Sequence, residues 1–463
     1  MKKALIAFAA VAASSLAMGD YEAKWESLDK RPVPQWWTDA KFGIFIHWGP
    51  YAVPAYAPTP DGRKFNSDLY AEWYHGKLIG KNKKFVEHHE KMYGNAPYGN
   101  FAAEFKAENF DAKKWADLFK RAGARYVVLT SKHHDGYALW PSPETPYYNS
   151  VMLGSGRDIA REFCDAMREA GLKRGFYYSL LEYANPYYPS ARHVKDKTAL
   201  SIEEWNERMN LPQLKELADK YEADIIWPDG EWDFPSSRHC SEKYLAWLFN
   251  ESKVKDTVVV NDRWGNDSRG RHGGHYTTEY LLEGFNNDGV SDTHPWEECR
   301  GIGNSFGYNR FETPDEYMTR ERCIETLASC VSRGGNLLLN IGPTADGRIP
   351  AIMQDRLLAM GRWLEVNGEA IYATQGGGVN DPGAKDGKVY YTRKGSSLYA
   401  ICFKWPKGEL NLSGVGAVKG VSLLGSQVAI GFKADGNSVV IDASSVSPAD
   451  MPCELAWVFK LSR

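Results

Sequence analysis

Short apolar segments alternate with helical segments between about residues 40 and 370, and this alternation strongly restricts the possible folds. The apolar segments cover residues 42–46, 126–129, 174–179, 225–227, 257–261 and 336–341. The helical segments cover residues 115–122, 157–170, 211–221, 242–251, 315–332 and 355–365. Strands that alternate with helices indicate a parallel sheet with crossover connections. About eight such units fit the available length, which favours a (β/α)8-like barrel. An open doubly wound sheet is the alternative, but no Gly-rich nucleotide-binding turn follows the first strand.

The composition of the chain changes after about residue 375. Three glycines at 376–378 indicate a hinge, and short alternating strands separated by turn residues follow it. This pattern is typical of an antiparallel β-sandwich. We therefore predict a signal peptide at residues 1–18, a catalytic (β/α)8-like barrel at 19–375 and a C-terminal β-sandwich at 376–463.

The N-terminus reads as a secretory signal. Lys2 and Lys3 precede the apolar residues 4–13, and Ser15-Leu16-Ala17 supplies the small residues of a cleavage site. The apolar stretch is too short to span a bilayer. We therefore expect a periplasmic or secreted protein without membrane insertion.

Charge and cysteine spacing argue against several classes of protein. The net charge is −3, which gives no basic surface for nucleic acid. The seven cysteines include no Cys-x-x-Cys pair, so neither a zinc ribbon nor a thioredoxin-like site is indicated. We assign no disulfide to them.

Polar residues follow several of the predicted strands. In α/β barrels, side chains at the carboxyl ends of the strands form the active site. Asp229 follows the apolar residues 225–227 and Pro228, and it precedes Gly230, which permits a sharp turn. The other polar residues at such strand ends are His47, His133, His134, Arg263 and Glu279.

Each of these residues also has an ordinary structural interpretation. Asp229 could cap a helix, and His47 could be a hydrogen-bonded core histidine. Adjacent residues on a strand point to opposite faces, and no third ligand accompanies His133 and His134, so we expect no metal. Glu279 and Glu297 could be solvated loop acids.

The aromatic content favours carbohydrate chemistry. The chain has 16 Trp and 26 Tyr, many of them in loop-like segments beside His, Asp and Glu. Glycoside hydrolysis typically requires two carboxylates. Asp229 is the candidate nucleophile, because Arg263 nearby would hold it ionised. Glu279 is the candidate acid, but Glu297 and Glu298 remain alternatives.

Several motifs together resemble those of the α-L-fucosidases of glycoside hydrolase family 29. The resemblance covers roughly residues 25 to 375 and is carried in order by KFGIFIHWG at 41–49, SKHHDG at 131–136, WPDG at 227–230, NDRWG at 261–265, NLLLNIGP at 336–343 and WL-x-x-NGEAIY at 363–372. The family's barrel with a C-terminal β-sandwich agrees with the fold that the alternation of elements indicates.

The resemblance implies a role for each matching residue. Asp229 matches the nucleophile, and Glu279 matches the acid/base in the motif Thr-x-Glu-Tyr. Residues that match the sugar-binding and pocket-wall positions are His47, Glu72, Trp73, His133, His134, Tyr177, Trp227 and Arg263.

We therefore expect an exported, retaining exo-α-L-fucosidase that removes terminal α-L-fucosyl residues from oligosaccharides or polysaccharides. No metal or organic cofactor is required. Two alternatives remain: α-L-galactosidase activity at the same site, and a catalytically silent fucose-binding lectin.

Overall fold

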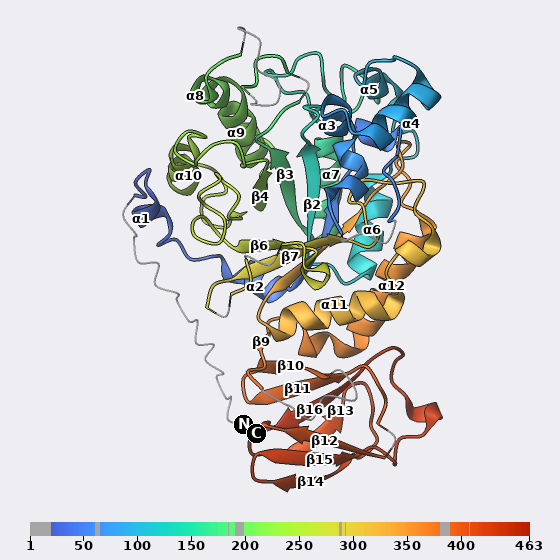
Figure 1. Cartoon of the computed structure of the whole chain (residues 1–463). Helices are drawn as coiled ribbons and strands as arrows, with labels where there is room; N and C mark the ends of the chain where they lie inside the picture. The colour runs from blue at the N-terminus through green and yellow to red at the C-terminus, as the bar shows by residue number, and fades with distance from the viewer. Residues whose placement is uncertain are drawn as a thin grey trace, which may run out of the picture.

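A computed structural model shows an eight-stranded parallel barrel sheet above a smaller all-β unit (Figure 1). It describes residues 20–60, 65–183, 185–189, 199–286, 289–291, 293–379, 389–406 and 408–463. The predicted signal peptide lies outside the described residues.

The barrel strands follow the order β5-β4-β3-β2-β1-β8-β7-β6, and every neighbouring pair is parallel. The two edge strands meet through a parallel bridge between Asn261 and His275, which curls the sheet toward closure. This confirms the predicted (β/α)8-like barrel. The strands are β1 Phe42–Ile46, β2 Tyr126–Lys132, β3 Lys173–Ser179, β4 Ile225–Asp229, β5 Val259–Val260, β6 Tyr276–Glu279, β7 Trp296–Gly301 and β8 Asn336–Ile341.

Helices surround the sheet, and local signals fix several of their ends. Asp111 caps α6 by accepting from the backbone nitrogens of Lys113 and Lys114, and Gly171 ends α7 in the left-handed region at φ 75°. The helices are α1 Trp25–Leu28, α2 Gln35–Ala40, α3 Tyr74–Ile79, α4 Lys83–Tyr93, α5 Asn100–Glu104, α6 Ala112–Arg121, α7 Ile159–Ala170, α8 Ile202–Trp205, α9 Leu211–Asp219, α10 Ser241–Asn250, α11 Arg320–Ser332 and α12 Ala351–Asn367.

Helix α11 begins later than the sequence predicts. The sequence favours a start at residue 315, but residues 314–316 form a separate 3-10 turn. Thr319 then caps α11 by accepting from the backbone nitrogen of Arg322. The capping hydroxyl therefore fixes the start of the helix.

Strand β7 is not among the strands predicted from the sequence. All six residues of β7 are buried. Glu297 and Glu298 interrupt the apolar pattern, and each carboxylate accepts from a buried hydroxyl, of Tyr126 and Thr278 respectively. Buried charged residues are rare unless paired, so a pattern of apolar residues does not find such a strand.

Aromatic side chains fill the interior of the barrel. Trp227 packs between Phe45 and Tyr177, with ring centroids 5.0 and 5.7 Å away. These rings belong to a buried cluster that also includes Tyr126 and Leu338. The rigid cluster forms a floor beneath the carboxyl ends of the strands.

The C-terminal unit consists of two antiparallel sheets, which confirms the predicted β-sandwich class. One sheet has the order β13-β16-β11-β10-β9 and the other β12-β15-β14. Helices α11 and α12 lie between the barrel and this unit (Figure 1). Its strands are β9 Gln375–Gly376, β10 Val389–Lys394, β11 Ser397–Cys402, β12 Glu409–Ser413, β13 Gly420–Leu423, β14 Gly431–Asp435, β15 Ser438–Asp442 and β16 Trp457–Ser462.

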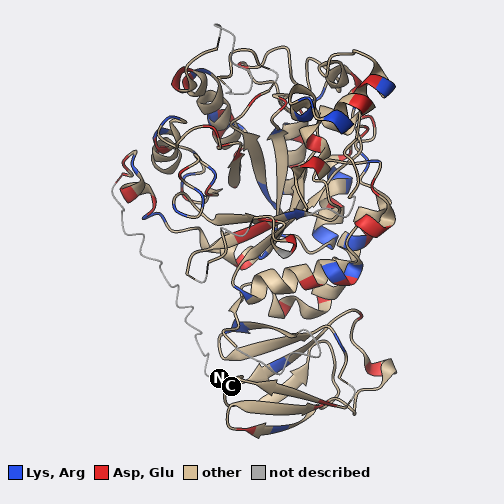
Figure 2. Cartoon of the chain, viewed as in Figure 1, with Lys and Arg blue, Asp and Glu red and all other residues tan. Residues whose placement is uncertain are grey.

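Charged residues of both signs are interspersed over the helices and loops, whereas the barrel strands are largely uncharged (Figure 2). Within the described ranges, no helix combines the length and the apolar character needed to cross a membrane.

Candidate active site

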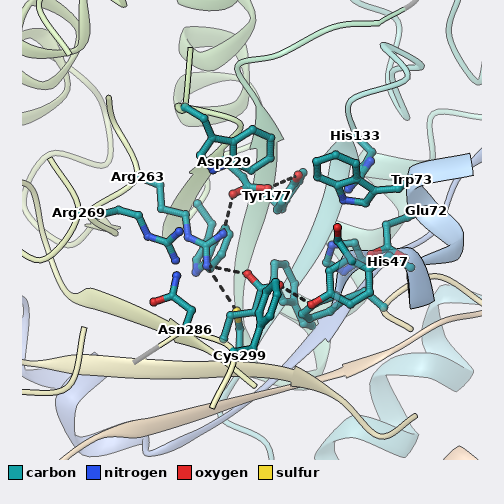
Figure 3. Close-up of a pocket in the computed structure, with 18 residues that line it drawn as sticks. His47, Glu72, Trp73, His133, Tyr177, Asp229, Arg263, Arg269, Asn286 and Cys299 are labelled. Atoms are coloured by element: carbon teal, nitrogen blue, oxygen red, sulfur yellow. Dashed lines mark hydrogen bonds and ion pairs between the residues drawn. The ribbon is translucent and has the colours of Figure 1, made fainter. Parts of the chain in front are cut away.

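A cavity of about 260 Å³ opens at the carboxyl ends of the barrel strands (Figure 3). This volume is near the lower end for ligand pockets, which suits one small ligand such as a single sugar ring. Nine of the ten predicted site residues line it, and they are His47, Glu72, Trp73, His133, Tyr177, Trp227, Asp229, Arg263 and Glu279.

Asp229 is the last residue of β4, and its carboxylate is held by three side chains. Arg263 Nη1 donates to Oδ1 at 2.6 Å, and the Tyr177 hydroxyl donates to Oδ2 at 2.8 Å. His134 Nε2 lies 3.7 Å from Oδ2. Burial opposes ionisation, but Arg263 and His134 outweigh it, so the pKa of Asp229 is below its usual value. Asp229 thus faces the cavity as a carboxylate and does not serve as a helix cap.

Gly230 lets the chain turn away immediately after Asp229. Its φ of 81° lies in the left-handed region, and a Cβ there would approach Leu181 Cβ to 2.9 Å. The sharp turn predicted from the sequence is confirmed.

Glu279 is the last residue of β6 and lies across Arg263 from Asp229. The Tyr70 hydroxyl donates to Oε1 at 2.7 Å, and Arg263 Nη2 donates to Oε2 at 3.4 Å. The backbone of Glu279 exchanges two hydrogen bonds with Asn286, of 3.1 and 3.0 Å. The strand end and the returning loop therefore fix both the backbone and the carboxylate.

Arg263 joins the two carboxylates and is itself held in place. Its Nε donates to Thr277 Oγ1 at 3.0 Å, and its guanidinium lies 4.5 Å above the Trp227 ring. One planar cation thus contacts both Asp229 and Glu279, which keeps the two carboxylates within reach of one bound sugar.

The rival carboxylates Glu297 and Glu298 do not line the cavity. In the register of β6 with β7, Glu279 pairs with Cys299, and Thr277 pairs with Glu297. Glu297 therefore lies two residues deeper, roughly 6–7 Å along the strand. It accepts from the Tyr126 hydroxyl at 2.5 Å and from Trp227 Nε1 at 3.0 Å.

Glu298 faces the opposite side of the sheet from Glu297. Its carboxylate accepts from the backbone nitrogen of Leu281 at 2.9 Å and from the Thr278 hydroxyl. Both rivals are therefore engaged in structural hydrogen bonds away from the cavity.

His47 follows β1, and Asn340 on β8 fixes its tautomer. The Asn340 amide nitrogen donates to the Phe306 carbonyl at 2.7 Å, which leaves its oxygen facing His47 Nδ1, also at 2.7 Å. Nδ1 must then carry the proton, and Nε2 is an acceptor. Burial lowers the pKa of His47 to about 3, so the ring is neutral.

His133 and His134 follow the end of β2 on the side of Asp229. His133 lines the cavity, and its ring is stacked with Tyr177 at a centroid distance of 5.4 Å. Burial lowers the pKa of His133 well below its usual value. His134 is the one predicted residue behind the cavity wall, where its Nδ1 lies 2.6 Å from Ser179 Oγ. Within the described residues, no group of three His, Cys, Asp or Glu is arranged to hold a metal ion.

Glu72 and Trp73 form the wall opposite Arg263 (Figure 3). Glu72 accepts from the backbone nitrogen of Gly307 at 2.8 Å, and burial raises its pKa to about 7. Trp73 packs against Trp232 with ring centroids 5.5 Å apart. The Glu72 carboxyl group and the Trp73 ring thus border the cavity on this side.

Sequence reasoning did not assign the remaining residues of the wall to the site. Tyr70 is two residues before Glu72, and Trp232 follows Asp229 by three residues. Their closeness in sequence to predicted site residues could have suggested both. The others come from segments with no such signal. The additional lining residues are Phe45, Ser67, Tyr70, Trp232, Arg269, Phe285, Asn286, Cys299 and Phe306.

Family models match nearly the whole chain. The model of the alpha-L-fucosidase family matches residues 8–369, and that of the alpha-L-fucosidase C-terminal domain matches residues 383–462. The chain belongs to the alpha-L-fucosidase family. It is a glycoside hydrolase with α-L-fucosidase function, and its substrates are fucosylated glycans.

Full-length relatives support the same membership. The chain is 39% identical to a tissue alpha-L-fucosidase of Rattus norvegicus, over 99% of this chain and 96% of the relative. An alpha-fucosidase structure from Thermotoga maritima, in complex with a mechanism-based inhibitor, is 36% identical with a TM-score of 0.79, covering 96% of this chain and 100% of that one.

A more distant solved relative comes from Bacteroides thetaiotaomicron. This family 29 alpha-L-fucosidase is described as a trapped covalent intermediate in complex with 2-fluoro-fucosyl fluoride. It is 25% identical with a TM-score of 0.73, covering 92% of this chain and 95% of that one.

Proposed function

We propose that this chain is an exported, retaining exo-α-L-fucosidase in which Asp229 is the nucleophile and Glu279 is the acid/base. The observation that carries the proposal is the pair of carboxylates on one guanidinium, at the opening of a cavity sized for one sugar. Retaining glycosidases hold their two carboxyl groups about 5 Å apart.

In the first step, Asp229 Oδ attacks the anomeric carbon while Glu279 protonates the departing glycosidic oxygen. The bond from C1 to that oxygen breaks, and a fucosyl ester of Asp229 forms. In the second step, Glu279 takes a proton from water, and the hydroxyl attacks C1 and releases Asp229. Two inversions give net retention.

The low pKa of Asp229 suits the nucleophile. Arg263 and His134 favour its charged form at neutral pH, and Tyr177 orients it. Arg263 also orients Glu279, together with Tyr70. A single arginine therefore positions both reacting groups.

Neutral histidines are suited to recognise sugar hydroxyls. His47 Nε2 can accept from one hydroxyl, because Nδ1 is committed to Asn340. His133 Nδ1 is buried without a hydrogen-bond partner in the described part of the chain, which leaves it for a second hydroxyl. Glu72 and Trp73 would border the same ring.

Phe45 and Phe306 offer an apolar surface for the C5 methyl group of fucose. Both line the cavity, with ring centroids 6.4 Å apart. An L-galactoside would place an additional hydroxyl against such a surface, and burying an unpaired hydroxyl is unfavourable. We therefore expect lower kcat/KM for an aryl α-L-galactoside than for the matching fucoside.

The covalent intermediate described for the Bacteroides relative supports the double displacement proposed here. The direct test follows the fucose released from an aryl α-L-fucoside by proton NMR during early turnover. Retention requires the α-anomer to appear first and then mutarotate. Initial release of the β-anomer would show inversion and refute the mechanism.

Covalent labelling with a 2-fluoro-fucosyl fluoride tests which residue is the nucleophile. Tandem mass spectrometry of the digested enzyme should place the label on Asp229 itself. A label on Glu72 or Glu231 would overturn the assignment. A lectin without catalysis would acquire no label.

We also propose export to the periplasm or the medium. The support is the sequence pattern of residues 1–17. Intact-mass measurement of protein recovered outside the cytoplasm should show a chain that begins near residue 19. Recovery of only the full-length chain from the cytoplasm would contradict export.

A further inference from the structure

Arg269 projects into the cavity wall beside Arg263 and Asn286, on the side away from His47, His133 and Trp73 (Figure 3). It lies between β5 and β6, and its side chain is 22% exposed. Arg269 is thus a partly exposed residue of the cavity wall.

The guanidinium of Arg269 is poorly paired. Its Nε and Nη2 are buried and have no hydrogen-bond partner among the residues that the structure describes. Within the described ranges, its ion pair joins Nη1 to Glu231 Oε1 at 3.9 Å, which exceeds hydrogen-bond distance. Arg263, in contrast, donates to Asp229, Glu279 and Thr277. Two donors of Arg269 are therefore unpaired, and an anionic partner would satisfy this guanidinium.

Glu231 neutralises Arg269 only in part. Both of its oxygens are buried without hydrogen-bond partners in the described structure. Burial raises the pKa of Glu231 to about 7, and Asp229 adds to this, although Arg269 opposes it. Glu231 is therefore a weak counter-charge for Arg269, because its carboxylate lies beyond hydrogen-bond distance and burial disfavours its charged form.

Arg269 lies on the side of the cavity where the leaving group is expected. The acid must contact the glycosidic oxygen, so the aglycone extends past Glu279. The backbone of Asn286 pairs with Glu279, and Arg269 lies beside Asn286. His47, His133 and Trp73, which are expected to contact fucose, lie across the cavity (Figure 3).

We propose that Arg269 binds an anionic group, a carboxylate or a sulfate ester, on the sugar to which fucose is attached. Guanidinium forks bind such planar or multi-oxygen anions through paired, charge-assisted hydrogen bonds. Arg269 is therefore a specificity-determining residue for acidic fucosylated glycans. The inference rests on the proposed function, because it requires the aglycone to pass Glu279.

The test compares kcat/KM on matched fucosyl disaccharides. One pair carries galactose or galacturonic acid as the second sugar, and the other carries N-acetylglucosamine with or without a sulfate ester. We expect wild-type enzyme to prefer a charged member by about tenfold or more, as a charge-assisted hydrogen bond provides. The pair that shows the preference identifies the anion.

Arg269→Gln should abolish this preference, and Arg269→Lys should retain part of it, because lysine keeps the charge without the fork. Arg271→Gln is the matched control, since Arg271 is exposed and lies outside the cavity wall. It should keep the wild-type preference. Raising the salt concentration should weaken the preference in wild type.

Equal kcat/KM of wild type for charged and neutral members of both pairs would overturn the inference, whether or not the variants fold. A preference that survives in Arg269→Gln would also overturn it. An aryl α-L-fucoside serves as the reference substrate. If it is hydrolysed with retention while the preference for charged disaccharides is absent, the inference about Arg269 fails and the proposed function stands. Hydrolysis of the aryl fucoside with inversion, or no hydrolysis, would instead refute the proposed function.

Discussion

Replacing Arg263 with glutamine should shift the acidic limb of the kcat/KM profile to higher pH. In the wild-type chain, Arg263 Nη1 lies 2.6 Å from Asp229 Oδ1 and is the largest influence that opposes the effect of burial. Without the cation, burial dominates and the pKa of Asp229 rises. A higher pH is then needed to obtain the carboxylate that attacks C1.

The same substitution should destabilise the fold. Both side chains are nearly buried, at 4% and 10% exposure, so the change leaves an uncompensated charge. Breaking a buried pair in this way typically costs about 3–5 kcal/mol. We expect the apparent Tm to fall by about 3–5 °C.

The loss of stability should depend on pH. The pKa of Asp229 is lowered in the folded chain, so its contribution is present above the ordinary carboxyl pKa and is lost as the pH falls through the folded value. The difference in Tm between wild type and Arg263→Gln should therefore be largest near neutral pH and smaller in acid.

The assays are kcat/KM on an aryl α-L-fucoside from pH 3 to 9 and thermal unfolding at matched pH. Arg300→Gln is the control, because Arg300 is equally buried and pairs with Glu283 outside the cavity. It should lower the Tm without moving the acidic limb. An unmoved limb in Arg263→Gln would refute the view that Arg263 holds the nucleophile ionised.

Three further substitutions test neighbouring parts of the site. Glu279→Ala should reduce kcat/KM on natural linkages by about 10²–10⁴-fold and far less on substrates with good leaving groups, because a general acid contributes this much; equal losses on both would exclude the acid role. Glu297→Gln should lower the Tm, since Glu297 accepts hydrogen bonds from Tyr126 and Trp227 below the cavity. The dependence of kcat/KM on the leaving group should stay as in wild type; a steeper dependence would make Glu297 the acid. Asn340→Leu should raise KM about tenfold with a smaller change in kcat, since it leaves His47 Nδ1 unsatisfied; an unchanged KM would contradict the assigned tautomer.

Much of the barrel was predictable because its strands are apolar on both faces. Residues 42–46 and 336–341 are continuous apolar runs, or nearly so, and both are strands in the structure. Strand β7 was missed because Glu297 and Glu298 break this pattern, and β14 because all five of its residues are exposed. Local patterns identify strands whose residues are uniformly apolar, but not strands that carry buried charges or are exposed.

The sequence alone determined the position of Asp229. An apolar strand, a carboxylate and a glycine are adjacent in the chain, and the turn that presents the side chain is local. The same applies to His47, which follows β1. Local chemistry thus identified the proposed nucleophile and one side of the proposed sugar site.

Only the tertiary structure decided which glutamate shares the cavity with Asp229. The register of β6 with β7 places Glu279 at the opening and Glu297 a layer deeper. Tyr70 and Arg269 reach the same cavity from separate loops. Sheet register and loop return depend on contacts between residues far apart in the chain, and no local pattern encodes them.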